Sequence, residues 1–579
     1  MKTSRLFLPL MLGAIALTSC EDKMDYNEYA IYDKDYIALN FGNVGGFMTD
    51  LYNAVDYDFG NYSSGAFRGS ASDESQYSRI GNAIDAFYNG AWGPSNAKAT
   101  EWNTFYTSIR TANNFLEEFQ GLEFDELKLN ADYEAQMHRY KNYPFEVRFL
   151  RAYYYFALAR QYGGVPLVTT CISADETNRL TRNTSDEVFK FIIDECNAIK
   201  DSIIENYSNL GDYALGEAET GRADKLAVMA LRSRAALYYA SPLFNPSNDM
   251  TRYEDALKYT QELLDQCEES KKRLTSKYED LWASDNFSKS TIVREMLFTR
   301  RYYNNANGDN RVEGWNYPVG IEGGTGGNCP TQNLVDAYDM KNGKSIDDPT
   351  SGYNPNDPYK NRDPRLAVTV AVNGDNWPEY DKANILETFT GGANGQPIAG
   401  ATTTGYYLKK LCNGAISLAS NGRVKESKHA WITFRVGEIY LNYAEIAYRL
   451  TNSFTQVPNG GKMTAMEALN MLRSRAKVGV FSDANPVTWE RYQKERMVEL
   501  AFEGHRFWDV RRWKEADKFF KDIKGMEITK QVDPETEKVS YKYEVKTINN
   551  RMWDDKMYLF PIPQSERSKN PNLEQNPGW

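Results

Sequence analysis

Residues 145–164 read FEVRFLRAYYYFALARQYGG and give the strongest indication of how this chain folds. Apolar residues recur there at spacings of three and four, namely at Val147, Leu150, Tyr154, Ala157 and Leu158. This spacing predicts an α-helix with one apolar face. The face mixes alanine with aromatic residues, so small side chains on one helix leave room for large ones on its neighbour.

The same pattern recurs in GRADKLAVMALRSRAALYYASP (221–242) and in WITFRVGEIYLNYAEIAYRL (431–450). Each of these predicted helices is followed by a turn and a second candidate helix. The second helices are expected at about 186–203, 253–268 and 465–477, and further helices at 102–119 and 489–503. Paired helices of this kind resemble degenerate tetratricopeptide units separated by long insertions. A generic helical bundle is the alternative.

Between about 271 and 430 the composition changes. Stretches such as NNANGDNRVEG (304–314) and TGGANGQPIAG (390–400) are rich in Gly, Asn, Asp and Pro, which predicts turns and long loops. Short β-like runs such as 366–372 lie among them. We therefore expect a mainly α-helical protein, in which tetratricopeptide-like helix pairs carry a large loop-rich insertion with short β segments.

These boundaries define the expected organisation of the chain. After a leader at 1–19, residues 20–270 form an N-terminal helical region. Residues 271–579 form a C-terminal region, which is loop-rich to about 430 and helical from 431 onward.

The first twenty residues predict a lipoprotein signal peptide. Lys2 and Arg5 precede an uncharged run at 6–17, and Leu17-Thr18-Ser19-Cys20 follows. Positive residues, a short apolar run and small residues before a cysteine are the features of a secretory leader. Cys20 is then the lipidated first residue of the mature chain, held on a membrane by acyl chains. A transmembrane helix is the alternative, but a span needs about 20 apolar residues.

Composition excludes several classes of function. The formal net charge is -11, and such an acidic chain lacks the basic surface that nucleic acid requires. Five cysteines remain beside Cys20, and an odd number at wide spacing is not a disulfide framework, although one pair could bridge. The three histidines are scattered, and the sequence holds no HExxH, CxxC, GxSxG or EF-hand pattern. We therefore predict no catalytic residue, no cofactor and no metal site, and the sequence leaves open whether calcium orders a loop.

A series of motifs then carries a family resemblance. In chain order these are IRTANNFLEE (109–118), RFLRAYYYFALARQYGGVPLV (148–168), RDPRL (362–366), ERMVELAFEGHRFWDVRRW (495–513), YLFPIP (558–563) and NPNLEQNPGW (570–579). With them the chain resembles the SusD/RagB family of outer-membrane nutrient-binding lipoproteins over essentially its whole mature length.

The resemblance implies a lid that binds oligosaccharide, or peptide in the RagB branch, over a TonB-dependent barrel of the SusC type. It also implies a lipid-anchored location in the cell outer membrane. The acidic residues Glu21, Asp22 and Asp25 resemble the family's signal for surface exposure, and a plain solvated tether is the alternative.

The charged residues of 495–513 have a structural interpretation. Arg496 and Glu499, Glu503 and Arg506, and Asp509 and Arg512 are each three residues apart, which makes them neighbours on a helix. We expect these pairs to stabilise the fold rather than to bind ligand. His505 has no second histidine nearby in the sequence, so it is not expected to be a metal ligand or a base.

Ligand contacts are expected on two loop regions, because sugars need exposed aromatic surfaces beside polar groups that satisfy their hydroxyls. By position in the family, the first region is expected to contribute Asp73, Tyr77, Arg79, Tyr88, Trp92 and Asn96. The second is expected to contribute Tyr303, Trp315 and Tyr317, and Trp377 is a weaker candidate. Ordinary loop packing is the alternative for each of these residues.

Three functions remain open from the sequence. A glycan-capturing lipoprotein that delivers oligosaccharide to a SusC-like transporter is favoured. A peptide-capturing lid of the same family is second, since aromatic-rich loops favour sugar. A surface glycoside hydrolase is third, because such an enzyme needs two placed carboxylates and the many acidic residues here single out no pair.

Overall fold

The computed structural model describes residues 34–55, 61–98, 100–215, 221–283, 289–301, 309–422 and 424–579. The predicted signal peptide at 1–19, the predicted lipidation site Cys20 and the predicted ligand residue Tyr303 lie outside these ranges. The described chain is mainly α-helical, with short two-stranded sheets, which confirms the predicted fold class.

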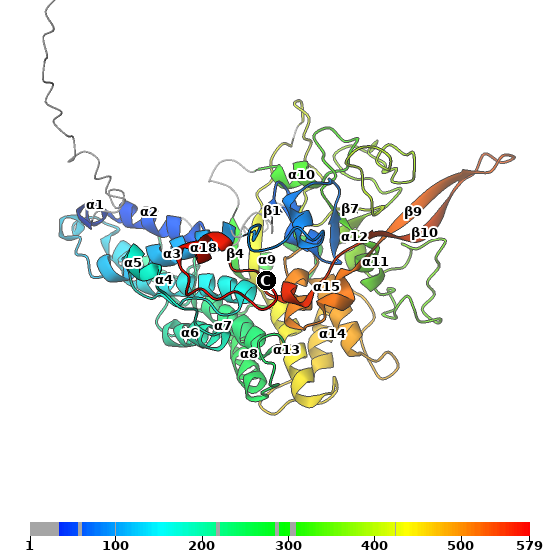
Figure 1. Cartoon of the computed structure of the whole chain (residues 1–579). Helices are drawn as coiled ribbons and strands as arrows, with labels where there is room; N and C mark the ends of the chain where they lie inside the picture. The colour runs from blue at the N-terminus through cyan, green and yellow to red at the C-terminus, as the bar shows by residue number, and fades with distance from the viewer. Residues whose placement is uncertain are drawn as a thin grey trace, which may run out of the picture.

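The helical scaffold winds through consecutive neighbours (Figure 1). Its long helices are α2 (Phe41–Tyr52), α3 (Thr100–Glu118), α4 (Tyr133–Tyr162), α6 (Ser185–Ile199), α7 (Lys225–Ala240), α8 (Thr251–Glu269), α13 (Val436–Thr451) and α14 (Ala465–Ala476). From α3 onward, each helix in this order packs against the next. The short helices α1 (Lys34–Ala38) and α5 (Ala174–Thr177) also belong to this half. The helix pairs expected from the periodicity are therefore present.

Helix α7 lies at the centre of the scaffold. Every residue from Leu226 to Ala240 is buried, because α6, α8, α13 and the strands β4 and β8 cover it from several sides. A helix enclosed in this way must pair its polar groups inside the protein. Arg234 does so through a bidentate ion pair with Glu438 of α13. This pair joins the N-terminal and C-terminal parts of the scaffold.

Side-chain caps fix the starts of several scaffold helices. Thr184 and Thr464 each form a capping box, with Glu187 and Glu467 respectively, and Asp224 accepts a hydrogen bond from the backbone N–H of Ala227. These groups satisfy backbone donors that a helix leaves unpaired in its first turn. The starts of α6 and α14 therefore lie within one residue of the predicted positions 186 and 465.

The loop-rich part surrounds short helices and strands. They are α9 (Ser290–Val293), β4 (Met296–Arg301), α10 (Arg311–Asn316), β5 (Asn328–Pro330), α11 (Gln332–Ala337), α12 (Pro364–Thr369), β6 (Val370–Ala371), β7 (Tyr407–Leu408) and β8 (Ala430–Arg435). Strands β1 (Asn61–Ser63), β2 (Ala66–Phe67) and β3 (Ser75–Tyr77) come from the N-terminal region, and Figure 1 shows β1, in blue, beside α10. The antiparallel pairs are β1–β2, β3–β5, β4–β8 and β6–β7. A second core of buried residues lies here, separate from the helical core.

Two predicted elements differ in the structure. The β-like run at 366–372 is mostly helical, because Asp363 caps α12 and Pro364 occupies its first turn, and only Val370–Ala371 is a strand. The helix predicted at 489–503 is α15 (Trp489–Glu499), which ends four residues early. The chain then turns through Phe502 and Gly504, both with positive φ, before α16 (Arg506–Arg512) begins.

This break changes the expected ion pairs of the 495–513 motif. Asp509 and Arg512 do pair at 2.9 Å. Arg496 instead pairs with Asp509 at 2.7 Å, and Glu503 pairs with Arg435 at 2.7 Å. Two of the three expected pairs are therefore wrong, since Glu503 lies between the helices and Glu499 faces the interior.

The structural role of the motif is nevertheless clear from its burial. Glu499 is fully buried and accepts hydrogen bonds from three guanidinium groups, those of Arg365, Arg435 and Arg475. Arg435 also reaches Glu295 at 3.0 Å. Removing one member of such a buried set leaves an uncompensated charge, which costs several kcal/mol. The motif thus ties α15 to β8, α12 and α14.

A long hairpin near the C-terminus was not predicted. Strands β9 (Asp522–Val532) and β10 (Val539–Asn550) pair with each other and project from the body of the protein (Figure 1). Short helices α17 (Ala516–Phe520) and α18 (Gln564–Lys569) lie before and after it. Across the described ranges, the structure contains no helix with the length and apolarity that a membrane span requires.

Candidate functional site

The structure brings the two predicted ligand regions together. Strand β3 pairs with β5, with Gln76 opposite Cys329, and the backbone N–H of Ser78 donates to the carbonyl of Gly327 at 2.9 Å. Beneath this pairing, the buried Asn328 side chain donates to the carbonyl of Gly65 at 2.8 Å. The two regions are therefore parts of one arrangement of paired backbone segments. We call this arrangement, which includes residues 73–79 and 315–317, the frame.

Trp315 is a partly buried aromatic residue of this frame. It lies on α10, and its ring packs on Gly65 in the β1–β2 turn. A Cβ atom on Gly65 would lie 2.7 Å from the Cγ and Cδ1 atoms of Trp315, and Gly65 has a φ of +88°. Only glycine suits both the close approach and this backbone conformation. One part of the indole is thus fixed against the backbone while another part remains exposed.

Buried polar contacts hold α10 in place. The Glu313 carboxylate accepts hydrogen bonds from His429 Nε2 at 2.9 Å and from the backbone N–H of Asn413 at 2.8 Å. The Asn316 amide oxygen accepts from the Asn328 side chain at 2.9 Å. Because Glu313, Asn316, Asn328 and His429 are buried, their hydrogen bonds restrict the position of α10 strongly. The Trp315 ring is therefore held on a rigid support.

Arg79 lies on the other side of the same glycine-rich turn at 325–327. The Thr325 hydroxyl donates to the carbonyl of Trp315 at 3.0 Å. A Cβ on Gly326 would meet Ser78 Oγ at 2.9 Å, and a Cβ on Gly400 would lie 3.7 Å from Arg79 Nε. Arg79 is exposed. The predicted Trp315 and Arg79 are thus attached to one turn, and both reach the surface.

Two further charged groups accompany Trp315 and were missed from the sequence. The Arg311 guanidinium lies 6.0 Å from the Trp315 ring centroid, and its Nε donates to Asp309 at 2.7 Å. A guanidinium near an indole and a carboxylate beside it supply donors and acceptors for a polyhydroxylated ligand. The signal was present in the sequence DNRVEGW, where charges alternate ahead of the tryptophan.

Four predicted aromatic contacts are instead buried. Trp92 is 6% exposed and packs edge-on against Phe87, Phe560 and Trp579, with ring centroids 4.7–5.1 Å apart. The hydroxyl of Tyr77 donates to the carbonyl of Ser64 at 2.9 Å. Tyr88 and Tyr317 are equally enclosed, and burial raises the pKa of both phenols above its usual range. None of these rings offers a free face, so the expectation that they stack on ligand does not fit the structure.

Asp73 is also a structural residue. Its carboxylate is buried and receives two hydrogen bonds from Arg506, at 2.8 Å from Nε and at 2.7 Å from Nη2. Both carboxylate oxygens are therefore engaged within the protein. The expected ligand contact from Asp73 does not fit this arrangement, since the group faces the 495–513 motif rather than solvent.

The remaining predicted residues lie apart from Trp315. Asn96 is exposed, but its amide donates to the carbonyl of Ala91 at 2.7 Å, in a turn that packs against the C-terminal segment through Pro94 and Gln564. Trp377 is buried and contacts Tyr317 edge-on at 5.8 Å. Of the residues predicted to touch ligand, Trp315 and Arg79 are therefore both linked to the turn at 325–327, and both retain some exposure.

The described ranges hold no metal cluster, and the environment of His505 is that of a structural residue. No cluster of three or more His, Cys, Asp and Glu side chains able to hold a metal ion occurs among those residues. His505 is buried, and burial together with the surrounding arginines lowers its pKa well below the usual value, so its imidazole is neutral. What the Trp315 surface can do chemically is bind a ligand with apolar faces and hydroxyl groups.

Comparison with known families matches the two halves of the chain separately. The profile of the family described as "SusD family" matches residues 249–579. A second profile, described as "Starch-binding associating with outer membrane", matches residues 44–237.

Among curated relatives, "SusD-like protein P2" of Formosa agariphila is 23% identical over 83% of this chain and 80% of its own length. A "SusD-like protein" of Bacteroides ovatus is 24% identical over 71% of this chain, which spans 65% of that protein.

Solved structures extend the likeness to the whole fold. A SusD-like protein from Bacteroides fragilis superposes with a TM-score of 0.73, at 24% identity, over 95% of this chain and 99% of its own. A SusD-like carbohydrate-binding protein from the same species gives 0.70 at 24% identity, over 93% and 100%. A laminarin-binding SusD-like protein gives 0.60 at 18% identity, over 93% and 99%. At these identities the likeness establishes the fold.

Proposed function

Because this chain belongs to the SusD/RagB family, we propose that it is a cell-surface lipoprotein that captures glycan and delivers it to a SusC-like TonB-dependent transporter. Relatives of the same fold are described as carbohydrate-binding and laminarin-binding proteins, which supports the ligand class. The protein holds its ligand by contact and does not transform it.

The observation that carries this proposal is the fixed and partly buried ring of Trp315, with the Arg311 guanidinium 6.0 Å from its centroid. A sugar ring has apolar C–H faces that stack on an indole and hydroxyl groups that pair with a guanidinium or a carboxylate. Because α10 and the turn at 325–327 are already held by buried hydrogen bonds, binding requires little ordering of the protein.

The size of the Trp315 contribution follows from its area. A tryptophan buries roughly 200 Å² in full contact, and one ring face is about a third of that area. At about 25 cal/mol per Å², stacking contributes about 1.6 kcal/mol. This free energy corresponds to about a tenfold change in affinity.

A peptide-capturing lid is the second candidate. Membership of the family supports this candidate, but no feature of the Trp315 surface does. The Trp315 indole with the Arg311 guanidinium near it favours a sugar ligand. A hydrolase is less favoured, because the buried carboxyl groups in this region, which include Asp73, Glu74 and Glu313, accept hydrogen bonds within the protein.

The proposal also includes a lipid anchor at Cys20 and delivery of the glycan to a transporter. Acylation at Cys20 would hold the mature chain on the outer membrane, where a transporter barrel is within reach of the tether. Incorporation of an alkyne-labelled palmitate into the wild-type protein, but not into Cys20→Ser, would support the anchor. Co-purification of a TonB-dependent barrel with the tagged lipoprotein from detergent-solubilised membranes would support the partner.

Affinity electrophoresis tests the ligand class. The mature protein is run through gels that contain a panel of polysaccharides, including starch, laminarin, mannan and xylan, and peptides are tested in parallel by calorimetry. We expect retardation by at least one polysaccharide, with no shortened product after overnight incubation. Binding to peptides alone would replace the proposal with the second candidate, and release of shorter glycans would replace it with a hydrolase.

A further inference from the structure

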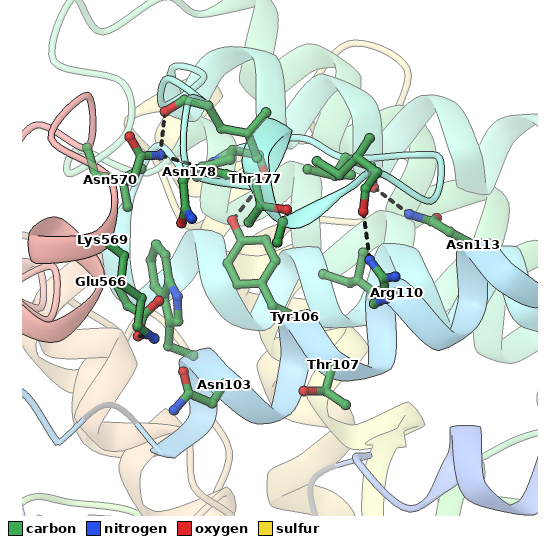
Figure 2. A pocket seen from close by; sticks show the side chains of 18 of the residues that line it. Asn103, Tyr106, Thr107, Arg110, Asn113, Thr177, Asn178, Glu566, Lys569 and Asn570 are labelled. Carbon is green, nitrogen blue, oxygen red and sulfur yellow. Dashed lines mark hydrogen bonds and ion pairs between the residues drawn. The ribbon is translucent and has the colours of Figure 1, made fainter. Parts of the chain in front are cut away.

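A hollow of about 620 Å³ lies on the helical scaffold, between α3, the segment 166–180 and α18 (Figure 2). Trp315 does not line it, since this residue lies on α10 in the loop-rich part. Its volume falls within the range of pockets that bind small ligands, roughly 300–1,000 Å³. None of the residues expected to bind ligand lines it.

One wall of the hollow is an extended segment that side chains of α3 hold in position. Four carbonyl groups accept these hydrogen bonds: Pro166 from Tyr106 at 2.9 Å, Val168 and Thr170 from Asn113 at 3.1 and 3.0 Å, and Ile172 from Arg110 at 2.8 Å. The bonded carbonyls are those of alternate residues, as in a β-strand. The segment therefore lies along α3 without packing flat on it, and space remains between the two.

The opposite wall is fixed by the C-terminal part of the chain. The buried Asn570, at the end of α18, donates from its amide to the carbonyls of Leu180 at 2.8 Å and of Thr177 at 3.2 Å. Figure 2 shows these bonds at one end of the hollow and those of Arg110 and Asn113 at the other. Both walls are thus formed before any ligand arrives, which lowers the entropic cost of binding.

The side chains that face the hollow combine a flat ring with amide groups. Tyr106 is half-buried, and its ring lies 5.0 Å from that of Trp102. Asn103 and Asn178 are exposed on opposite sides of the hollow, and within the described ranges neither side chain is hydrogen-bonded to the protein. An amide donates and accepts, which matches a sugar hydroxyl that does the same. The lining also includes the partly buried apolar residues Val168 and Leu180, which suit the C–H face of a sugar ring.

Charge and backbone pairing argue against other ligands. Lys569 forms an ion pair with Glu566 at 3.1 Å, so the charges at this end largely cancel and a polyanion gains little. A peptide added as a strand would need free carbonyls along the wall. The carbonyls of 166–172 that point toward α3 are already hydrogen-bonded to it.

From these observations, we propose that the hollow between α3, the segment 166–180 and α18 is a second saccharide-binding site, in which Tyr106 supplies the stacking surface and Asn103 and Asn178 pair with hydroxyl groups. The proposal does not rest on the function proposed for the Trp315 surface, because it concerns separate residues on a separate part of the fold.

The test uses the mature Trp315→Ala protein, so that binding at the first surface is weakened. Saturation-transfer NMR with maltohexaose, laminarihexaose and mannohexaose measures any remaining contact and its affinity. We expect at least one oligosaccharide to bind this protein. Each amide hydrogen bond contributes about a fivefold change in affinity, so adding Asn103→Ala and Asn178→Ala is expected to weaken this binding by about tenfold or more.

Two further variants complete the design. Thr107→Trp, on the exposed face of α3 beside the hollow, is expected to fill the space and abolish the residual signal. Asn130→Ala removes an exposed asparagine that lies outside the hollow and is expected to change nothing. Circular dichroism verifies that each variant keeps its helical content.

The second site is overturned if Trp315→Ala shows no saturation transfer from any of the oligosaccharides, or if its residual binding is unaffected by the two amide substitutions and by Thr107→Trp. Failure of the proposed function has a different signature. In that case the Trp315→Ala protein binds as tightly as the wild-type protein. The substitutions Asn103→Ala, Asn178→Ala and Thr107→Trp then abolish all binding.

Discussion

Replacing Asp73 by asparagine distinguishes a structural from a ligand-binding role for this residue. The change keeps the shape of the side chain but removes its charge, and leaves the buried Arg506 guanidinium with one neutral oxygen in place of a carboxylate. Breaking a buried ion pair on one side costs about 3–5 kcal/mol. One hydrogen bond to the new amide oxygen recovers part of this cost, so we expect a loss of about 3 kcal/mol in the free energy of unfolding.

Thermal unfolding followed by circular dichroism measures the effect. A loss of 1 kcal/mol lowers Tm by about 2–4 °C in chains of 150–250 residues and by less in longer ones. For this chain we therefore expect Asp73→Asn to lower Tm by roughly 3–6 °C. Glycan affinity, measured well below the transition, should stay within about twofold of the wild-type value, because Asp73 does not reach the surface.

Asp357→Asn is the matched control. It makes the same chemical change at an aspartate whose side chain is 53% exposed and lies 4.0 Å from Lys360, where an ion pair contributes about 0–1 kcal/mol. Its Tm should change by no more than about 1 °C. The reasoning is refuted if Asp73→Asn unfolds at the wild-type temperature while its glycan affinity falls tenfold, since Asp73 would then contact the ligand rather than hold the fold.

Three further outcomes follow from the buried groups. Trp92→Ala should lose about 3–5 kcal/mol of stability, as for other large core side chains, and a shift of the denaturant midpoint measures this loss. Burial opposes ionisation of Glu445, but the Arg512 guanidinium outweighs it and lowers the pKa of this carboxyl to about 2. Its contribution to stability is thus complete above the unfolded value of about 4.3 and is lost as pH falls toward 2, and Glu445→Gln should flatten this acid dependence. Burial raises the pKa of Glu74 to about 7. The effect of this carboxyl group on stability therefore has the opposite sign, and the free energy of unfolding falls as pH rises from about 4.3 through 7. Denaturant titration at pH 5 and pH 8 should show this fall in the wild-type protein but not in Glu74→Gln.

Helical periodicity predicted the scaffold well, because a helix is determined largely by residues close in sequence. The stripe at 228–239 lies in α7, and the capping threonines Thr184 and Thr464 stand where the paired helices begin. Strands were less predictable. The apolar, β-branched run at 366–372 became α12 because Asp363 and Pro364 favour a helix start, and the alternating strands β9 and β10 were overlooked although Asp533-Pro534 marks a turn between them.

The exposure of individual side chains could not be predicted in the same way, because it depends on distant partners. Trp92 is covered by Phe560 and Trp579, which come from the opposite end of the chain, and Asp73 is paired with Arg506, 433 residues away. The sequence offered no sign that the two loop regions are neighbours, because the β3–β5 pairing joins segments about 250 residues apart, and only tertiary packing distinguishes Trp315 from the buried aromatic residues. The amide-lined hollow between α3 and α18 joins three separate segments, so no local pattern could reveal it.

Calorimetric titration of Trp315→Ala with the oligosaccharide that the wild-type protein binds tests the central claim most directly. Tyr36→Ala, which removes a half-exposed aromatic residue from α1 at the other end of the molecule, is the control (Figure 1). The Trp315→Ala protein should bind about tenfold more weakly while it remains folded at the temperature of the titration, and Tyr36→Ala should bind as the wild type does. Equal affinities in all three proteins would contradict the assignment of the Trp315 surface as the place where this lipoprotein holds its glycan.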